Sequence, residues 1–323
     1  MTPRVDGSSR LQAPAEGSLV AIGNFDGVHR GHQHVVEEVN QAAAARRLAP
    51  LVLTFHPHPA AVLGKKAPDV LTVLERKIEL LVSAAPGMRV VVEPFDLELS
   101  RWSPERFAEQ LLVGALNAKL VVVGQNFRFG RGRAGDLHTL EALGQRFGFE
   151  ARALPLVSDA AGVLSSSRVR THVAAGELDE AQGILGRPHS LSGQVVRGDA
   201  RGRALGFPTA NLEGVAELLP PDGVYACAVD AVETGPRALS VGVANIGHRP
   251  TVEAGFSVEA HLLDFEGDLY GAHLRLHLLA RLRPEQRFAG LDALRQQIGR
   301  DVEHARTLIP TLCPPRPAQG GFF

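Results

Sequence analysis

The sequence has few cysteines and no long apolar segment. Only two cysteines, Cys227 and Cys313, occur among 323 residues, and they lie far apart in the chain. They form neither a CxxC motif nor a disulfide framework. This usage is typical of a reducing cytosol, so we expect a cytoplasmic location. No apolar run reaches about 18 residues, so we predict no membrane span.

Other features that the sequence lacks exclude further classes of protein. The formal net charge is -1, so no overall positive field recruits nucleic acid. The chain contains no GxxxxGK[ST] motif, which excludes a P-loop kinase. The hydrophobic content of 45% is normal for a globular core. The length predicts about two domains.

Both ends of the chain are predicted to be loose. Residues 1–16 lack the apolar core of a signal peptide and are expected to form a disordered tail. Residues 313–323 are rich in proline and glycine and are expected to be flexible.

The first half, residues 17–186, alternates apolar runs with helical patterns. Continuous apolar runs occur at 19–22, 51–55, 90–92 and 120–123. Such runs suit parallel strands that are covered on both faces. Segments 71–83 and 104–116 have helical spacing between them. We therefore predict a doubly wound α/β domain that binds ligands at the carboxyl ends of its strands.

The second half, residues 187–312, has a different period. Leu274, Leu276 and Leu278 alternate with polar residues, and segments 223–232, 239–246 and 257–265 are further candidate strands. Several short strands in succession predict a small antiparallel β-barrel. A last helix follows Pro284. Its apolar stripe is expected to be core without chemistry and consists of Leu291, Leu294, Ile298, Val302, Ala305 and Ile309.

The most informative segment is 21–32, AIGNFDGVHRGH. Glycines and an aspartate end the first apolar run, and His29 and His32 follow at the start of a helical stretch over 31–47. A helix N-terminus and two imidazoles attract an anion such as a nucleoside triphosphate. The pair can stabilise charge that develops on an α-phosphate under attack. Two alternatives stay open: simple capping and packing, or metal binding by His29, His32 and His34, although no cysteine or clustered carboxylate completes a ligand set.

Three more segments complete a family resemblance: 123–130 (VGQNFRFG), 165–170 (SSSRVR) and 202–211 (GRALGFPTAN). With segment 21–32 they closely resemble the prokaryotic bifunctional riboflavin kinase/FAD synthetase family over about residues 17–309. The resemblance implies an N-terminal nucleotidyltransferase domain that adenylylates FMN to FAD and releases pyrophosphate. It also implies a C-terminal barrel that phosphorylates riboflavin to FMN. Both reactions use ATP and Mg²⁺ in that family.

The resemblance also implies site residues. His29 and His32 would act on ATP phosphates, and Glu259 would be the catalytic base of the kinase. Ser167 and Val169 stand where the family usually has Thr and Ile. The nucleotide-binding residues implied in the first half are Gly23, Asn24, Phe25, Asp26, Gly31, Asn126, Ser165, Ser166, Ser167 and Arg170. Those implied in the second half are Gly202, Arg203, Gly206 and Pro208, with Thr209 and Asn211 as Mg²⁺ ligands.

The residues make chemical sense without the resemblance, and each has a plainer interpretation. Arg170 and the serines can wrap a triphosphate, although a serine-rich stretch is often only a flexible loop. Thr209 and Asn211 lie two residues apart, so an extended segment puts both oxygens on one face, which suits Mg²⁺. A proline-led turn is the alternative there. Glu259 could equally be an ordinary exposed carboxylate of a strand.

Two further short segments have two interpretations each, contact with flavin or a purely structural role. Residues 56–59, HPHP, follow the second strand and either contact flavin or shape a rigid loop. Phe127 and Phe129 either line a flavin pocket or belong to the core.

Three other functions compete with the bifunctional enzyme. A class I aminoacyl-tRNA synthetase shares an HxGH-type motif, but no KMSKS-like loop and no basic anticodon-binding patch are present. A single-activity enzyme would have one degenerate half, whereas every motif is filled. A nucleotide- or flavin-binding sensor would not consume ATP. The expected partners are small molecules, and the sequence contains no signal for a particular oligomer.

Overall fold

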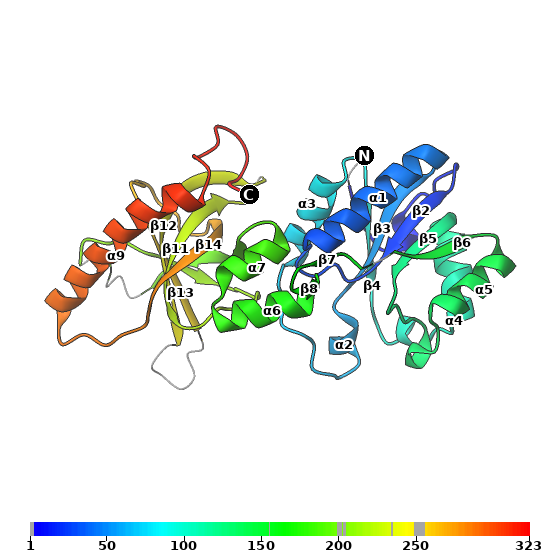
Figure 1. Cartoon of the computed structure of the whole chain (residues 1–323), viewed down its shortest axis with the longest axis horizontal. Helices are drawn as coiled ribbons and strands as arrows, with labels where there is room; N and C mark the ends of the chain where they lie inside the picture. The colour runs from blue at the N-terminus through cyan, green and yellow to red at the C-terminus, as the bar shows by residue number, and fades with distance from the viewer. Residues whose placement is uncertain (1–2, 155, 199–201, 203–204, 234, 249–255) are drawn as a thin grey trace. The chain divides into compact units, whose positions relative to one another are not determined.

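Figure 1 shows the computed structural model, which describes residues 3–154, 156–198, 202, 205–233, 235–248 and 256–323. The chain divides into two units. The first contains Met1–Pro68 and Leu74–Ser165, and the second contains Asp69–Val73 and Ser166–Phe323. The division therefore falls before the expected boundary at 186/187. Helices α6 (Ser166–Ala175) and α7 (Leu178–Leu185) belong to the second unit, because Leu178 of α7 is buried in the barrel core.

The first unit is built on a six-stranded parallel sheet with the order β1-β4-β3-β2-β5-β6. Four of its strands contain the predicted apolar runs, so the predicted α/β architecture is confirmed. The strands are β1 (Arg4–Asp6), β2 (Ser18–Ile22), β3 (Ala49–His56), β4 (Arg89–Pro94), β5 (Ala118–Gly124) and β6 (Glu150–Leu154). A separate hairpin is formed by β7 (Ser158–Asp159) and β8 (Gly162–Val163).

Helices connect these strands. The helix predicted over 104–116 consists of α4 (Pro104–Arg106) followed by η3, a π-helix (Phe107–Ala115). The other helices are α1 (Arg30–Arg46), α2 (Pro59–Val62), α3 (Leu74–Ala84) and α5 (Leu137–Phe147). Short 3₁₀ turns are η1 (Ser8–Arg10), η2 (Leu99–Arg101) and η4 (Arg131–Arg133).

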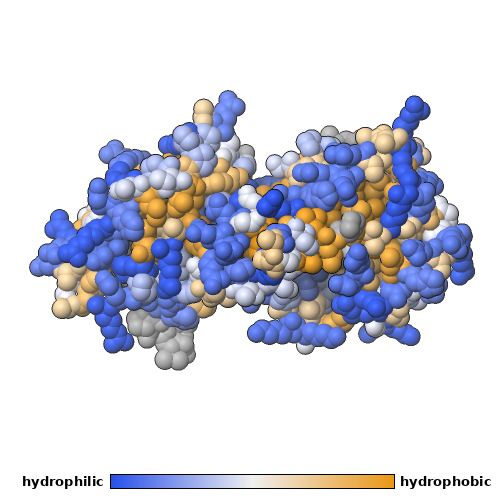
Figure 2. Space-filling model, viewed as in Figure 1, coloured by the Kyte–Doolittle hydropathy of each residue, from blue (hydrophilic) through white to orange (hydrophobic). Residues whose placement is uncertain are grey.

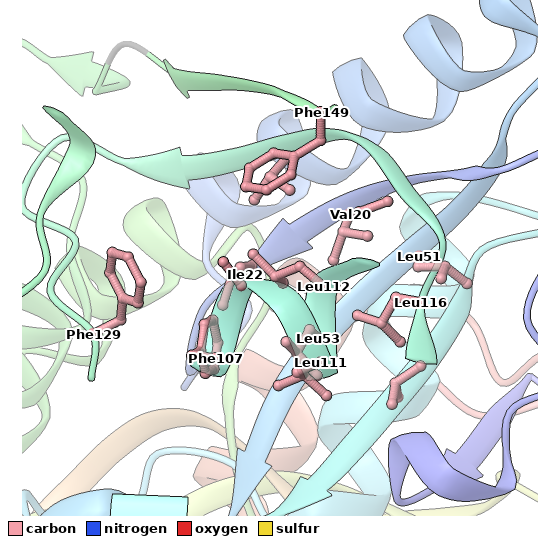
Figure 3. Close-up of a cluster of buried hydrophobic side chains, with 14 of the residues drawn as sticks. Val20, Ile22, Leu51, Leu53, Phe107, Leu111, Leu112, Leu116, Phe129 and Phe149 are labelled. Carbon is pink, nitrogen blue, oxygen red and sulfur yellow. The ribbon is translucent and has the colours of Figure 1, made fainter. Parts of the chain in front are cut away.

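Apolar layers cover both faces of the sheet. On one face, Val20 and Ile22 of β2 and Leu51 and Leu53 of β3 pack against η3, as Figure 3 shows, and the same cluster includes Leu140 and Leu143 of α5. The alternate residues of the same strands face α1 and α3 on the other side. A parallel strand buried on both faces needs apolar residues at every position, which explains the continuous apolar runs.

The expectation of a disordered tail over residues 1–16 is wrong. Strand β1 pairs in parallel with β4, with Val5 opposite Val91, and the side chains of Val5 and Leu11 are buried in the core. The Ser8 backbone N–H also donates a hydrogen bond of 2.6 Å to the Glu93 carboxylate. The segment is ordered because it covers the otherwise open edge of β4.

The second unit is a closed antiparallel barrel with the strand order β10-β13-β12-β11-β14-β9, as predicted. Its strands are β9 (His189–Val196), β10 (Ala210–Glu213), β11 (Gly223–Ala231), β12 (Arg237–His248), β13 (Phe256–Leu262) and β14 (His273–Pro284). Side chains of alternate residues, such as Tyr225, Ala244 and Ala260, fill its interior. The predicted C-terminal helix is α9 (Leu291–Leu312), which lies against β11, β12 and β14 (Figure 1).

Helix α9 covers part of the outer surface of the barrel. Ala305 and Ile309 are buried against Val224, Ala226 and Ala228 of β11. The helix is therefore amphipathic, with Ala305 and Ile309 toward the barrel.

On the face shown in Figure 2, hydrophilic residues cover most of the surface of each unit, and hydrophobic residues form smaller areas among the hydrophilic ones.

The expectation that residues 313–323 are flexible is also wrong. Cys313 and Phe322 are buried, and the Phe322 backbone N–H donates to the Asp230 carboxylate at 3.0 Å. Asp230 and His277 are both fully buried, with 2.9 Å between the carboxylate and Nε2. Burial by itself raises the pKa of Asp230. The hydrogen bond and charge of His277, the Phe322 N–H and the charge of Arg275 outweigh burial, so the pKa lies below its ordinary value.

We expect Asp230→Ala to destabilise the barrel by about 3–5 kcal/mol, because the change strips a buried histidine and a backbone N–H of their acceptor. A folded-state pKa below the unfolded value means that Asp230 stabilises the fold above about pH 4 and loses this effect as the pH falls further. Thermal melts of the parent protein and of Asp230→Ala, at pH values above and below about 4, measure the effect. The exposed Glu303 offers a matched control, Glu303→Ala. An unchanged melting temperature for Asp230→Ala would contradict the prediction.

Candidate active sites

A tight turn after β2 presents the first pair of histidines. Phe25, Gly27 and Val28 all have positive φ angles (50°, 80° and 39°), so the chain reverses sharply before α1. The Val28 N–H closes the turn by donating to the Phe25 carbonyl at 3.1 Å. A β-carbon at Gly23 would lie 3.0 Å from the Phe25 ring, so this ring packs directly on the glycine backbone.

His29 and His32 form a stacked pair at the start of α1. His29 is the N-cap residue, and its Nδ1 accepts a hydrogen bond from the His32 backbone N–H at 3.3 Å. The ring centroids are 3.7 Å apart, with 21° between the ring planes. A β-carbon at Gly31 would lie only 3.1 Å from the His29 ring, so the absence of a side chain at position 31 makes room for this ring. Because Nδ1 of His29 is an acceptor, we infer that the neutral ring carries its proton on Nε2.

The pair lies where the sheet topology places ligands. Strands β3 and β4 lie on one side of β2, and β5 lies on the other, so the connections diverge between the carboxyl ends of β2 and β5. Ligands of doubly wound sheets bind at such a switch point. Asn126 follows β5 there, in a turn closed by the Phe127 N–H to the Gly124 carbonyl at 3.0 Å. The histidine turn and Asn126 therefore extend from adjacent strand ends.

The end of β3 joins the same edge. His58 Nδ1 accepts the Ala60 N–H at 3.1 Å, so Nε2 is the donor of the neutral ring. Nε2 lies 3.1 Å from Nδ2 of Asn24, and an exchange of the amide oxygen and nitrogen of Asn24 gives this Nε2–H an acceptor. Of the two phenylalanines, Phe129 is buried in the core, and Phe127 is half-buried and stacks on it at 5.4 Å. Phe129 therefore follows the core interpretation, and both interpretations stay open for Phe127.

Sequence reasoning missed a lysine on α3 whose charge interacts with Asp26 of this turn. Lys77 of α3 lies on the helical stripe of Leu74, Ile78 and Leu81, where an apolar residue is expected. Burial lowers its pKa, and the Asp26 carboxylate partly offsets this effect. A lysine on an apolar stripe is the signal that could have pointed to it.

The predicted second phosphate-binding segment begins at the division between the units. Ser165 is the last residue of the first unit, and Ser166, Ser167 and Arg170 lie in the first half of α6 in the second. Arg170 donates from Nε to the carbonyl of Asp69 at 2.7 Å. Its approach to a nucleotide bound at His29 and His32 stays a prediction. Within the described residues, no three or more His, Cys, Asp or Glu side chains gather as a metal site would need.

In the second unit, the register of the barrel brings Glu259 between two asparagines. Glu259 of β13 is opposite Asn211 of β10 on one side and Asn245 of β12 on the other. The row continues through Val224 to Arg283. Residues directly opposite each other share a face of the sheet. Since the neighbours Ala210, Ala244 and Ala260 fill the interior, this row lies on the outside of the barrel.

A cavity of about 380 Å³ lies over this row, between the barrel and α9. Its barrel wall includes Thr209, Asn245, Glu259 and Arg283, and its α9 wall includes Leu294, Ile298, Asp301 and Val302. Its size is that of a small-molecule site. The expectation that the stripe of α9 is only core is therefore wrong for three of its residues. Leu291 differs too, since it is 70% exposed.

An ion pair fixes α9 at the cavity. Arg283 donates from Nε to both Asp301 oxygens at 3.0 Å, and a terminal nitrogen lies 2.8 Å from Oδ2. Gln297 donates to the same carboxylate at 2.9 Å. This planar pairing sets the position of the helix against β14. Sequence reasoning missed the pair because its members are brought together only by the fold.

Of the predicted phosphate and metal residues, Gly202 and Thr209 line the cavity. Thr209 lines both this cavity and a second one of about 90 Å³, which Pro208, Phe265 and Tyr270 also line. The Pro208 carbonyl accepts a hydrogen bond from His261 Nδ1 at 2.8 Å. A β-carbon at Gly202 would lie 2.4 Å from the Phe207 carbonyl oxygen, and Gly206 has a φ of 89°. Arg203 lies outside the described residues.

Comparison with known proteins gives a consistent result for both units. Residues 11–168 match the FAD synthetase family, and residues 185–309 match the riboflavin kinase family. The bifunctional riboflavin kinase/FMN adenylyltransferase of Escherichia coli K12 is 41% identical over 298 residues, which cover 91% of this chain and 94% of that protein. The enzyme of the same name from Pseudomonas fluorescens is 37% identical and covers 94% of this chain and 97% of its own.

A solved structure from Streptococcus pneumoniae, described as a macrolide-efflux protein, has a similar fold. Its TM-score is 0.80 at 29% identity, and the match covers 94% of this chain and 98% of that one. In the described part of the present chain, none of the helices is long and apolar enough to cross a bilayer.

Proposed function

Because the chain belongs to the family of bifunctional riboflavin kinase/FMN adenylyltransferases, we propose specific roles for its residues in two successive reactions. The barrel phosphorylates riboflavin to FMN with ATP, and the parallel-sheet unit transfers AMP from ATP to FMN, which gives FAD and pyrophosphate. The observation that best supports the roles is that Glu259, flanked across the strands by Asn211 and Asn245, lies with Asn245 on the wall of the larger cavity.

For the kinase, riboflavin occupies the larger cavity and the nucleotide the smaller one, since Thr209 borders both. Glu259 accepts the proton of the riboflavin 5′-hydroxyl as that oxygen bonds to the γ-phosphorus. The bond from the γ-phosphorus to the bridging oxygen breaks, and ADP leaves. The apolar side chains of α9 hold the flavin ring away from water.

Thr209 and Asn211 fit a role as Mg²⁺ ligands. They provide neutral oxygens two residues apart, and a β-carbon at Gly198 would lie only 2.4–2.6 Å from the Asn211 amide, so this side chain is confined. When bound, the ion would neutralise phosphate charge. Gly202, Gly206 and Pro208 belong to the loop that would cradle the phosphates, and we assign Arg203 to it from the sequence alone.

For the adenylyltransferase, a phosphate oxygen of FMN attacks the α-phosphorus of ATP. The bond from the α-phosphorus to the oxygen that bridges it to the β-phosphate breaks, and pyrophosphate leaves. His29 and His32 donate hydrogen bonds to the charge that develops. The turn of Gly23, Asn24, Phe25, Asp26 and Gly31 shapes the site, Asn126 contacts the nucleotide, and Ser165, Ser166, Ser167 and Arg170 hold its phosphates.

We also propose a cytoplasmic location and small-molecule ligands only. Cys227 and Cys313 are both free thiols within the core, which suits a reducing compartment. Burial raises the pKa of Cys227 to about 12, so this thiol stays protonated and unreactive.

The test of the proposed function is chromatography of flavins after incubation with riboflavin and Mg-ATP. We expect FMN to appear first and FAD to follow, with ATP consumed in both steps. Accumulation of FMN alone, at excess ATP and Mg²⁺, would contradict the adenylyltransferase role. Binding of flavin without turnover would indicate a sensor instead.

A further inference from the structure

We propose that Ser257 is a positioning residue for riboflavin phosphorylation, and that it holds the Glu259 carboxylate in the orientation that accepts the hydroxyl proton. The inference rests on the proposed role of Glu259 as the base. Ser257 belongs to none of the sequence motifs that indicated the function.

The proposal starts from a direct contact. The Ser257 hydroxyl donates a hydrogen bond of 2.9 Å to Oε1 of Glu259. The two residues are two positions apart on β13, so both side chains stand on the outer face of the barrel. Ser257 lies opposite Gly247 of β12, and the Glu285 carboxylate occupies the space over that glycine, 3.1 Å from where its β-carbon would be. The contact is half-buried, so water competes with it only in part.

The contact matters because two other polar side chains that line the cavity with Glu259 have different partners. Arg283 pairs with Asp301, and His261 donates to the Pro208 carbonyl. Asn211 and Asn245 flank Glu259 across the strands, but among the described residues the one side-chain hydrogen bond to this carboxylate comes from Ser257. A glutamate side chain has three rotatable bonds, and a donor on one oxygen fixes how the other is presented.

The first experiment is Ser257→Ala in the full-length protein. Without its donor, Glu259 samples unproductive orientations, so kcat for FMN formation should fall about 10- to 100-fold, the range for a hydrogen bond to a charged group. KM for riboflavin should stay within about twofold, since no contact with the flavin ring is removed. Ser257→Thr keeps the hydroxyl and should restore most of the kcat.

Two controls separate positioning from damage to the barrel. Ser240→Ala removes another hydroxyl of the barrel, one that donates to backbone carbonyls away from the larger cavity, and should leave kcat unchanged. Conversion of supplied FMN to FAD should be unaffected by Ser257→Ala. A loss of kcat in Ser240→Ala equal to that in Ser257→Ala would assign the effect to general disturbance and overturn the proposal.

The variant Glu259→Gln and the double variant decide how Ser257 acts. If Glu259→Gln is impaired and Ser257→Ala is not, the role of Ser257 is refuted while the proposed base stands. If Glu259→Gln is fully active, the role of Glu259 fails and the proposal fails with it. In the double variant, Ser257→Ala should cause no further loss, because the group that it positions is gone. If the fold-losses in kcat of the two single variants multiply in the double variant, Ser257 acts independently of Glu259, and this result also overturns the proposal.

Discussion

Replacement of His29 by alanine is expected to lower the rate of FAD formation from FMN by about 10²–10³-fold, the usual effect of losing one preorganised donor to developing charge. Replacement of His32 should act similarly, because the two rings stack at 3.7 Å and we propose that both donate to the same phosphate groups. Phosphorylation of riboflavin should be nearly unchanged, since its residues belong to the other unit. Rates measured separately with FMN and with riboflavin as substrate test both statements.

His29 also caps α1, so loss of the cap must be distinguished from loss of the donor. Asparagine at position 29 keeps a side-chain acceptor for the His32 backbone N–H, which is a favoured N-cap arrangement. It lacks the imidazole Nε2–H. We therefore expect His29→Asn to melt near the parent temperature and to be as inactive in adenylylation as His29→Ala. Recovery of the FAD rate by asparagine would reduce His29 to a capping residue.

His34 provides a matched control on the same helix. It is exposed and lies 3.3 Å from Glu38, one turn further along α1. His34→Ala should leave both activities intact. A loss as large as that of His29→Ala would favour the alternative in which His29, His32 and His34 share a metal ion. Equal losses in both reactions for the His29 variants would indicate misfolding or a shared site.

The parallel sheet could be predicted because each central strand is buried on both faces. Such a strand is a continuous apolar run, as in Leu51–Leu53, and its pattern is visible without any partner. Strand β1 could not be predicted, since three residues with one buried side chain have no recognisable period. At the other end, the proline and glycine content indicated a loose tail. The burial of Phe322 depends on Asp230, a partner that only the fold brings near.

The observed division between the two units also differs from the predicted boundary at 186/187, because it too depends on packing partners that only the fold brings near. The change of hydrophobic period near residue 187 marks where the barrel strands begin, and the sequence places α6 and α7 before it. Which core a helix joins is decided by packing, and Leu178 joins the core of the barrel. A hydrophobic period identifies a helix or a strand, but it does not identify the elements against which that helix or strand packs.

For the kinase site, the motifs indicated Thr209, Asn211 and Glu259 but not which side chains lie beside Glu259. The placement of Asn245 and Ser257 beside Glu259 is recognisable only through the register β10-β13-β12 and through the contact between Ser257 and Glu259. Strand order in a barrel depends on closure between distant segments, and local sequence carries little of that information. The Arg283–Asp301 pair was missed for the same reason.

The second large effect is expected for Glu259→Gln in the kinase. Glutamine keeps the size of the side chain and an acceptor for the Ser257 hydroxyl, but it cannot take up the proton of the attacking ribityl oxygen. General-base catalysis contributes about 10²–10⁴-fold, so kcat for FMN formation should fall by that factor. Riboflavin should still bind, because the cavity wall formed by Leu294 and Ile298 is unchanged. Steady-state rates and a riboflavin titration measure the two effects separately.

The contrast with other measurements makes this result specific to Glu259. Supplied FMN should still become FAD, since His29 and His32 are untouched. Glu213→Gln, at an exposed position on β10, removes a carboxylate of the same barrel and should leave kcat unchanged. If Glu259→Gln melts like the parent and still makes FMN at a near-normal rate, proton transfer does not depend on this residue. Glu259 would then be an ordinary strand carboxylate between two asparagines, and the base would have to be sought among the other groups that line the cavity.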